Sequence, residues 1–310
     1  MKILKMGTRG SHLALAQARL VARQLEGLHS DLTVEERIIR TTGDKNQGQP
    51  LPEIGGKGVF TLEIEDALLN GEIDFAVHSL KDLPPLMPEG LCLAAVPLRE
   101  NPCDTLVLHD FNIPSVENGD LALKILPLGA LVGTSSGRRA AMLRNLRPDL
   151  KIESVRGNID TRIRKLNEEG FHAIVLARAG LTRAAIEPSN TLNLPESWFV
   201  PAPGQGALAL QSRKDDLGCR AILMALEDSP TRAAIEAERA VVSHLEAGCS
   251  TPLGVLARSV GDAISMHAVV LSLDGAQRIA VSVQGSGAPE LIGIRAAKSL
   301  LEKGAREILG

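Results

Sequence analysis

One stretch of the chain decides the fold, residues 130–176, which runs ALVGTSSGRRAAMLRNLRPDLKIESVRGNIDTRIRKLNEEGFHAIVL. Its short apolar runs at 130–133, 152–155 and 173–176 are typical of buried strands. The segments at 136–146 and 158–169 have helical spacing, and Asn158 is a good helix-capping residue. Strands and helices alternating at this pace predict parallel βαβ units, whose ligands bind at the carboxyl ends of the strands.

The same alternation precedes this stretch, and a different pattern follows it. The sequence predicts strands at 3–6, 33–40 and 74–77 and helices at 12–26 and 62–69. After residue 228 it predicts a helix at 231–247, strands at 263–272 and 277–283 joined by the hairpin turn Asp274-Gly275, and a last helix from 288 to the end. We therefore expect an α/β protein with two lobes and a small C-terminal α+β domain. Residues 42–58 contain too many glycines, prolines and polar residues for either element and are expected to form a functional loop.

The composition excludes several classes of protein. The chain has 310 residues, is 44% hydrophobic and carries a net charge of −3, which argues for two or three soluble domains and against nucleic-acid binding. No apolar run approaches the roughly 20 residues of a membrane span, and the N-terminus lacks a signal peptide, so we expect a cytoplasmic protein without a membrane partner. The four cysteines (92, 103, 219 and 249) are scattered, which predicts reduced thiols and no metal site.

Arginine dominates the positive charge. Of the 34 basic residues 23 are Arg, and residues 138–183 contain nine of them. Arg also stands beside Ser, Thr or Asn in three turns that open helices: Thr8-Arg9-Gly10-Ser11, Gly133 to Arg139, and Arg156-Gly157-Asn158 with Arg162. Helix N-termini attract anions, and the guanidinium group grips carboxylates at two points. The pattern predicts a polyanionic ligand held between the two α/β domains.

Two residues are candidates for chemistry. Cys249 follows Gly248, which we expect to end the helix at positive φ, so that the thiol stands on a short loop. Asp82 lies in HSLKDLP after a strand, where cationic neighbours keep a carboxylate ionised. Taken singly, a lone Cys is more often a buried hydrophobic residue and an Asp more often a turn former. A two-lobed anion receptor without catalysis, and a thiol acyltransferase that uses His244, are the alternatives.

Longer motifs carry a resemblance that covers residues 8–254. They are Thr8-Arg9-x-Ser11-x-Leu13-Ala14-Leu15-x-Gln17, Gly55-Gly56-Lys57-Gly58-x-Phe60, His78 to Pro84, Gly133-Thr134-Ser135-Ser136-x-Arg138-Arg139, Arg156-Gly157-Asn158-x-x-Thr161-Arg162, Ala179-Gly180-Leu181-x-Arg183, Pro203-Gly204-Gln205-Gly206-Ala207 and Gly248-Cys249 with Pro252-x-Gly254. Together they resemble the porphobilinogen deaminase (hydroxymethylbilane synthase) family. The resemblance implies two doubly wound lobes like those of type II periplasmic binding proteins plus a C-terminal α+β domain. The implied domains are 1–100 with 205–225, 101–204, and 226–310.

The resemblance implies a transferase of tetrapyrrole (haem) biosynthesis. Such an enzyme deaminates four porphobilinogen molecules and joins them head to tail on a covalent dipyrromethane primer, and water then releases hydroxymethylbilane. Loss of ammonia leaves an azafulvene cation, which a neighbouring pyrrole α-carbon attacks. By motif match, Cys249 carries the dipyrromethane cofactor as a thioether and Asp82 is the catalytic carboxylate. We expect a monomer, and the resemblance leaves open a hand-off of the product to the next pathway enzyme.

The remaining site residues are also carried over by motif match. Those expected to bind the cofactor are Lys81, Ser79, Thr134, Ser136, Arg138, Arg139, Arg156 and Gly157. Those expected to bind substrate are Arg9, Ser11, Arg156, Arg162, Arg183, Gln205 and Phe60, the last by stacking on a pyrrole ring. Gly55, Gly56 and Lys57 match the family's mobile loop over the site.

Overall fold

The structure of the chain is a computed structural model that describes residues 2–45, 60–109, 123–248 and 251–309. The chain divides into two compact units. Unit 1 comprises Met1–Glu100 and Gly206–Ala233, and unit 2 comprises Asn101–Gln205 and Ala234–Gly310. Within the described ranges, every helix is too short or too polar to cross a membrane.

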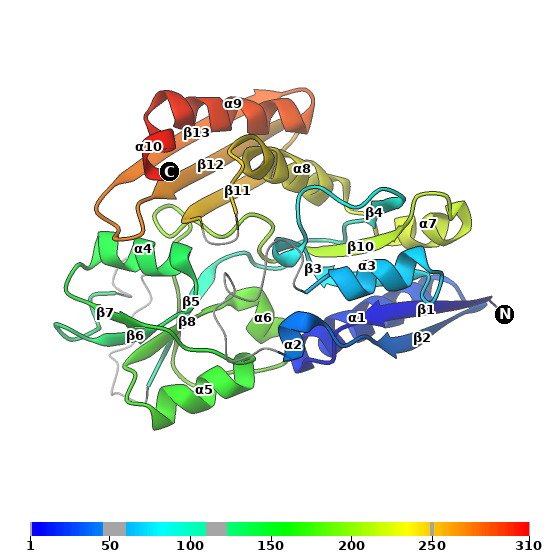
Figure 1. Cartoon of the computed structure of the whole chain (residues 1–310), viewed down its shortest axis with the longest axis horizontal. Helices are drawn as coiled ribbons and strands as arrows, with labels where there is room; N and C mark the ends of the chain where they lie inside the picture. Colours follow the sequence, from blue (N-terminus) through cyan, green and yellow to red (C-terminus); the bar gives the residue numbers. More distant parts are fainter. Residues whose placement is uncertain (1, 46–59, 110–122, 249–250, 310) are drawn as a thin grey trace. The chain divides into compact units, whose positions relative to one another are not determined.

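Unit 1 is built on a five-stranded sheet in the order β2-β1-β3-β10-β4 (Figure 1). Its strands are β1 (Lys2–Thr8), β2 (Leu32–Ile38), β3 (Phe75–Ser79), β4 (Leu91–Ala95) and β10 (Leu208–Arg213). Strand β1 is parallel to β2 and β3, whereas β10 is antiparallel to β3 and β4. The sheet is therefore mixed, and the expectation of parallel units holds for only part of it. Strand β10 enters from unit 2 without a crossover helix, so nothing requires it to be parallel.

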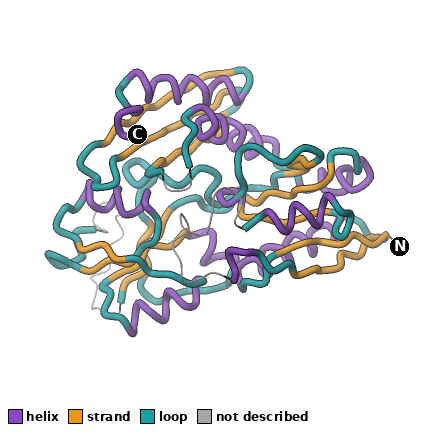
Figure 2. The backbone as a smooth tube through the Cα atoms, viewed as in Figure 1, coloured by secondary structure: helices purple, strands orange, loops and turns teal. Residues whose placement is uncertain are grey.

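Helices cover both faces of this sheet because its central strands are apolar on both sides (Figure 2). Phe75 and Val77 of β3 belong to a core cluster with α1 (His12–Leu28) and α7 (Leu217–Leu223). Ala76, which alternates with them, packs in a second cluster with α3 (Leu62–Leu69). Successive side chains of a strand point to opposite faces, so α1 and α3 lie on opposite faces of the sheet. The predicted helix at 62–69 is confirmed to the residue.

Unit 2 contains a second five-stranded sheet in the order β7-β6-β8-β5-β9 (Figure 1). Its strands are β5 (Asp104–Leu108), β6 (Leu131–Gly133), β7 (Lys151–Glu153), β8 (Ala173–Ala177) and β9 (Thr191–Asn193), and its helices are α4 (Gly137–Leu146), α5 (Ile159–Glu168) and α6 (Arg178–Arg183). Strand β6 is parallel to β7 and β8, as the alternation predicted, whereas β5 is antiparallel to β8 and β9. Asn158 caps α5 by accepting a hydrogen bond from the Thr161 amide at 3.0 Å, which confirms the predicted cap.

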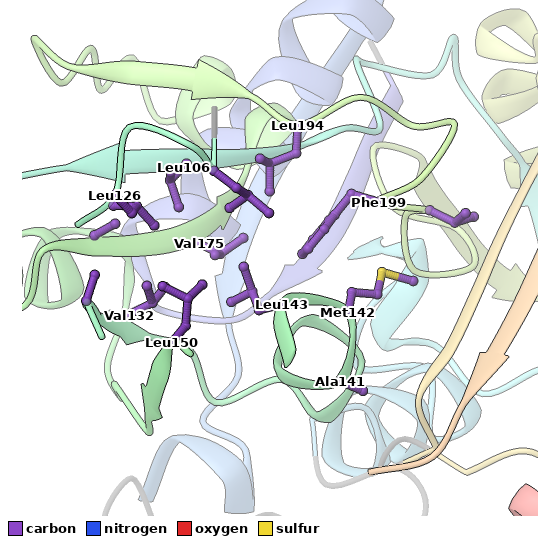
Figure 3. Packing of buried hydrophobic residues seen from close by; sticks show 14 of the residues in the cluster. Leu106, Leu126, Val132, Ala141, Met142, Leu143, Leu150, Val175, Leu194 and Phe199 are labelled. Carbon is purple, nitrogen blue, oxygen red and sulfur yellow. The ribbon is translucent and has the colours of Figure 1, made fainter. Parts of the chain in front are cut away.

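The C-terminal part of unit 2 is a three-stranded antiparallel sheet in the order β11-β12-β13. Its elements are β11 (Leu253–Val260), β12 (Ala263–Leu271), β13 (Arg278–Ser286), α8 (Ser229–His244), α9 (Pro289–Glu302) and α10 (Ala305–Leu309). Leu256, Val269 and Leu271 join the core that Met142, Leu143 and Phe199 form with the five-stranded sheet. Figure 3 shows the part of this core around Met142 and Phe199. The two sheets of unit 2 thus share one hydrophobic core.

Three local predictions are corrected. Helix α8 ends at His244, and Glu246, with φ of 52°, takes the left-handed position expected of Gly248. The amides of Glu246 and Ala247 bond to the carbonyls of Ser243 and Val242, which is the hydrogen-bond pattern of a Schellman cap. The last helix is broken at Gly304, with φ of 91°, into α9 and α10. A short helix, α2 (Thr42–Lys45), opens the segment expected to be loop.

Candidate active site

Asp82 stands exposed on a short turn at the end of strand β3. The strand leads directly into η1, a single 3₁₀ turn (Leu80–Asp82). Leu80 and Leu83 on either side are buried, whereas Lys81 and Asp82 are exposed. The Leu80 amide donates to the Ala207 carbonyl at 3.0 Å, and the Leu83 amide donates to the Leu80 carbonyl at 3.1 Å. Buried leucines and backbone hydrogen bonds therefore hold the turn and leave Lys81 and Asp82 at the surface.

Arg9 and Phe60 contact each other within unit 1. The Arg9 guanidinium carbon lies 4.2 Å from the centre of the Phe60 ring, a cation–π contact. Gly43 also lies close to the ring, and an added Cβ there would come within 2.1 Å of a ring carbon. Phe60 therefore occupies space that exists only because residue 43 is glycine.

Ser11 and Ser79 make structural hydrogen bonds in the same unit. The Ser11 hydroxyl caps α1 by accepting from the Ala14 amide at 3.3 Å. The Ser79 hydroxyl donates to the buried Gln17 side chain at 3.0 Å. Both side chains stay partly exposed, so the predicted contacts with ligand would come in addition to these bonds.

Arg138 and Arg139 meet at Asp104 in unit 2, where all three side chains are buried. The Nη2 of Arg138 donates to Oδ2 of Asp104 at 2.7 Å, and the Nε of Arg139 donates to Oδ1 at 2.9 Å. Arg138 also donates to the Val200 carbonyl at 2.7 Å, and Arg139 to the Val175 carbonyl at 2.9 Å. The α4 helix thus presents two fixed guanidinium groups to one carboxylate.

The charges in this cluster do not balance. Burial alone would raise the pKa of Asp104, but the positive charges of Arg138 and Arg139 outweigh it and lower the pKa to about 2. Burial also lowers the pKa of Arg138, and its Nε is buried without a hydrogen-bond partner among the described residues. Two guanidinium groups face a single carboxylate here, and the Nε–H of Arg138 is left without an acceptor among the described residues. Both features favour the binding of a second anion.

Gln205, Thr134 and Ser136 lie around the same cluster. The Nε2 of Gln205 donates to Oδ1 of Asp104 at 3.0 Å and to the Pro102 carbonyl at 2.7 Å. The Thr134 hydroxyl accepts from the Ser136 amide at 3.2 Å. The Ser136 hydroxyl caps α4 by accepting from the Arg139 amide at 3.4 Å. The structure therefore brings together five of the predicted residues: Thr134, Ser136, Arg138, Arg139 and Gln205.

Arg156, Arg162 and Arg183 are partly exposed in unit 2. The Arg162 Nε donates to the Gly157 carbonyl at 2.8 Å. Gly157 has φ of 114°, and an added Cβ would come within 2.5 Å of the Thr161 side chain, so this position requires glycine. The turn that opens α5 is therefore shaped by Gly157 and held by Arg162.

Cys249, Gly55, Gly56 and Lys57 lie outside the described residues. The residues that follow Cys249 are anchored within unit 2: at Gly254 an added Cβ would come within 2.7 Å of the Val200 carbonyl, and the Val255 amide donates to the Pro201 carbonyl at 2.9 Å. The Val200 carbonyl is the same group that binds Arg138. The strand that begins after Cys249 is thus packed against a segment held by Arg138.

Two of the other three cysteines, Cys103 and Cys219, are buried. Burial, together with the charge of Asp104, raises the pKa of the Cys103 thiol to about 11. Burial, with Asp216 and Asp74, raises the pKa of the Cys219 thiol to about 12. Cys92 is partly exposed and lies 3.9 Å from the Ser212 hydroxyl. Cys103 and Cys219 are protonated and poor nucleophiles at neutral pH.

Sequence reasoning did not identify Asp104, although a signal was present. Asp104 opens the strand DTLVL, whose five residues are all buried. A carboxylate at the head of an apolar strand is rarely buried unless it is paired, so it points to a cationic partner elsewhere in the chain.

Comparison with known proteins finds one family that matches nearly the whole chain. Residues 4–221 match the family described as "Porphobilinogen deaminase, dipyromethane cofactor binding domain", and residues 233–302 match "Porphobilinogen deaminase, C-terminal domain". The porphobilinogen deaminase of Syntrophobacter fumaroxidans is 44% identical over 309 residues, covering 99% of this chain and 97% of that protein. The enzyme of Nostoc sp. is 43% identical, covering 99% and 94%.

Solved structures give a weaker likeness. The methionine-binding protein MetQ aligns with 72% of this chain and 89% of its own, at 13% identity and a TM-score of 0.43. The effector-binding domain of a BenM variant covers 73% and 93%, at 13% identity and a TM-score of 0.43. Scores this low say nothing about activity. The sequence matches span both the cofactor-binding and the C-terminal domain, so the chain belongs to the porphobilinogen deaminase family.

Proposed function

We propose that Asp82 is the catalytic carboxylate of this porphobilinogen deaminase and that Cys249 carries its dipyrromethane cofactor. The observation that supports the proposal is the turn at Leu80–Asp82. Two buried leucines, Leu80 and Leu83, fix this turn and leave Lys81 and Asp82 exposed. A carboxylate held in this way needs no rearrangement before it meets a developing positive charge.

The cluster around Asp104 fits a group that carries carboxylates. Its positive charge exceeds its negative charge, and the buried Nε–H of Arg138 has no acceptor among the described residues. We propose that Arg138 and Arg139, with Thr134, Ser136, Arg156, Gly157, Ser79 and Lys81, hold the cofactor. When bound, the dipyrromethane supplies the pyrrole end to which the first substrate unit is joined. Gln205, predicted to bind substrate, acts in this proposal through Asp104, because both hydrogens of its Nε2 are engaged.

Asp82 acts on the substrate during deamination. The C–N bond of the aminomethyl group breaks, its electron pair leaves with ammonia, and positive charge develops on the substrate's pyrrole ring. The Asp82 carboxylate stabilises this charge, an effect worth several kcal/mol in comparable sites. A new C–C bond then forms to the α-carbon of a neighbouring pyrrole, whose α-proton is lost. Asp82 is the group that moves protons in both steps.

Substrate carboxylates need hydrogen-bond donors of their own, most of them cationic. We propose Arg9, Arg162 and Arg183, with Arg156 and the hydroxyl of Ser11, for this role, and Phe60 as an aromatic surface for the pyrrole ring. Phe60 already lies against the Arg9 guanidinium, which supports a joint role for the two side chains.

The three-domain division also belongs to this proposal. The described residues form three separate sheets, in the order expected for domains 1–100 with 205–225, 101–204 and 226–310. We further propose that the enzyme works as a cytoplasmic monomer.

Intact-mass measurement tests the assignment of Cys249. We expect the wild-type protein and the matched control Cys92→Ser, expressed in a haem-competent host, to carry the extra mass of two pyrrole units. Cys249→Ser should have the mass of the bare chain. An adduct retained in Cys249→Ser would exclude Cys249, and a wild-type protein at the bare mass would argue against a covalent cofactor.

A further inference from the structure

A buried polar network interrupts the apolar packing between β3, β10 and α3. The Nε2 of His78 lies 3.0 Å from Oε1 of Gln211, and the Nε2 of Gln211 donates to Oε1 of Glu65 at 3.0 Å. The Thr61 hydroxyl donates to the other Glu65 oxygen at 3.4 Å. All four side chains are buried. Buried polar groups are costly unless every bond is made, so a continuous network here points to a specific role.

The chemistry of Glu65 determines the protonation of His78. A carboxylate accepts hydrogen bonds, so the Gln211 amide must turn its NH₂ group toward Glu65 and its oxygen toward His78. That oxygen is an acceptor, which requires the proton of a neutral His78 to be on Nε2. Burial, together with the charge of Arg9, lowers the pKa of His78 to about 4, although the bond to Gln211 opposes the shift. Glu65 is thus the charged member of the network, and Arg9 is a charged group outside it that acts on His78.

The network connects two segments that the proposed mechanism uses. Thr61 follows Phe60 and precedes helix α3, and Glu65 lies in that helix. His78 lies in strand β3, and the exposed Asp82 follows four residues later. Gln211, in β10, lies between Glu65 and His78. In the sheet it pairs with Ala76 of β3, the strand that also carries His78. Outside the network, the Thr42 amide donates a hydrogen bond to the Glu63 side chain at 2.7 Å. This bond connects the start of α3 to helix α2.

We infer that Gln211 is a positioning residue of the deaminase: its amide holds the start of α3, and with it Phe60, in fixed register with the strand that presents Asp82. Gln211 touches no reacting atom, and its effect passes through His78 and Glu65. The inference rests on the proposed catalytic role of Asp82. Small displacements of a catalytic group can cost about 100-fold in rate, so a loosened network lowers kcat more than it raises KM.

Substitution of Gln211 tests the inference. Gln211→Glu keeps the size and can accept from His78, but an ionised carboxylate at position 211 cannot donate to the Glu65 carboxylate. We expect kcat to fall on the order of tenfold, with a smaller rise in KM from the loosened Phe60. The new carboxylate should also raise the pKa of His78, which adds a pH dependence to kcat between about pH 5 and 7 beyond that of the wild type. Gln211→Leu removes both bonds and should lower kcat further. Ser212→Ala, on the next residue of the strand and outside the network, should keep the wild-type kcat.

Histidine NMR gives a readout that needs no variant. In the wild-type holoenzyme at pH 6, His78 should be neutral with its proton on Nε2. A charged His78, or one protonated on Nδ1, would overturn the inference, as would folded Gln211 variants whose kcat stays within about twofold of wild type over the whole pH range. Asp82→Asn is assayed in parallel. An active Asp82→Asn enzyme removes the proposed function, whereas an inactive one combined with unaffected Gln211 variants removes only this inference.

Discussion

Asp104 and Arg138 form a buried ion pair, with 2.7 Å between Oδ2 of Asp104 and Nη2 of Arg138. The other oxygen of Asp104 binds Arg139. Because both side chains of the pair are buried, the guanidinium of Arg138 is oriented mainly by its protein partners. Asp104 is therefore the residue that determines where two proposed ligand-binding arginines point.

Asp104→Asn should destabilise the protein and impair cofactor binding. The substitution leaves two buried guanidinium groups without an anion, a loss of about 3–5 kcal/mol for broken buried pairs. Urea unfolding measures the stability, and intact mass measures the fraction of chains that carry the adduct. Asp149→Asn is the control, because the pair of Asp149 with Arg147 is partly exposed and its loss should matter less. Equal stability losses in the two variants would contradict the assigned role of Asp104.

Acid should destabilise the fold in two stages. His78 has a folded pKa of about 4, below its ordinary 6.5, so the unfolded chain takes up the proton first as the pH falls. The contribution of His78 to the free energy of unfolding, about 3 kcal/mol, is complete above pH 6.5 and is lost as the pH falls toward 4. Asp104, with a pKa of about 2, loses its contribution between about pH 4 and 2. Urea midpoints measured against pH check this.

His78→Gln is the variant for the first stage. It should flatten the dependence between pH 6.5 and 4, because the titrating group is gone. The control is His244→Gln, since His244 is exposed at the end of α8 and should leave the wild-type slope unchanged. A slope that His78→Gln leaves intact would show that His78 is not the group responsible.

Asp82→Asn should lose catalysis and keep the fold. The side chain is exposed, and the turn is held by Leu80 and Leu83, so unfolding should be unchanged. We expect kcat to fall by at least about 100-fold, because the amide cannot stabilise a cation or move a proton. Steady-state assays and intact mass measure turnover and adduct. Asp66→Asn, another exposed aspartate of unit 1, should stay fully active.

Gly43→Ala should weaken substrate binding through Phe60. The new methyl group would come within 2.1 Å of the Phe60 ring and must push it away from Arg9. We expect KM for porphobilinogen to rise severalfold, with a smaller change in kcat. Gly27→Ala is the matched control, because a Cβ at that helical position meets nothing within 4 Å. Its KM should be that of the wild type, and its stability should rise by about 0.5–1 kcal/mol. A KM unchanged in both variants would mean that Phe60 does not act on substrate binding.

Local sequence patterns predicted many of the helices and strands, because such elements depend on residues that are near one another in the sequence. Apolar periodicity located α3, β1 and the β12–β13 hairpin, because these elements are specified by neighbouring residues. Strand β10 was missed, since the direction and partners of a strand that returns from another unit leave no local signal. The helix caps at Ser11, Ser136 and Asn158 are also local, because each capping side chain accepts a hydrogen bond from the amide three residues later.

The amino-acid sequence by itself determined the family, the residue types of the candidate site and the helices that present them, because motifs and caps depend on short spacings. Only the tertiary structure showed that Asp104 pairs with Arg138 and Arg139, 34 and 35 positions away. The same is true of Gln211 between His78 and Glu65, 133 and 146 positions away. These contacts arise when distant segments are buried together, and burial is what makes their charges and hydrogen bonds strong.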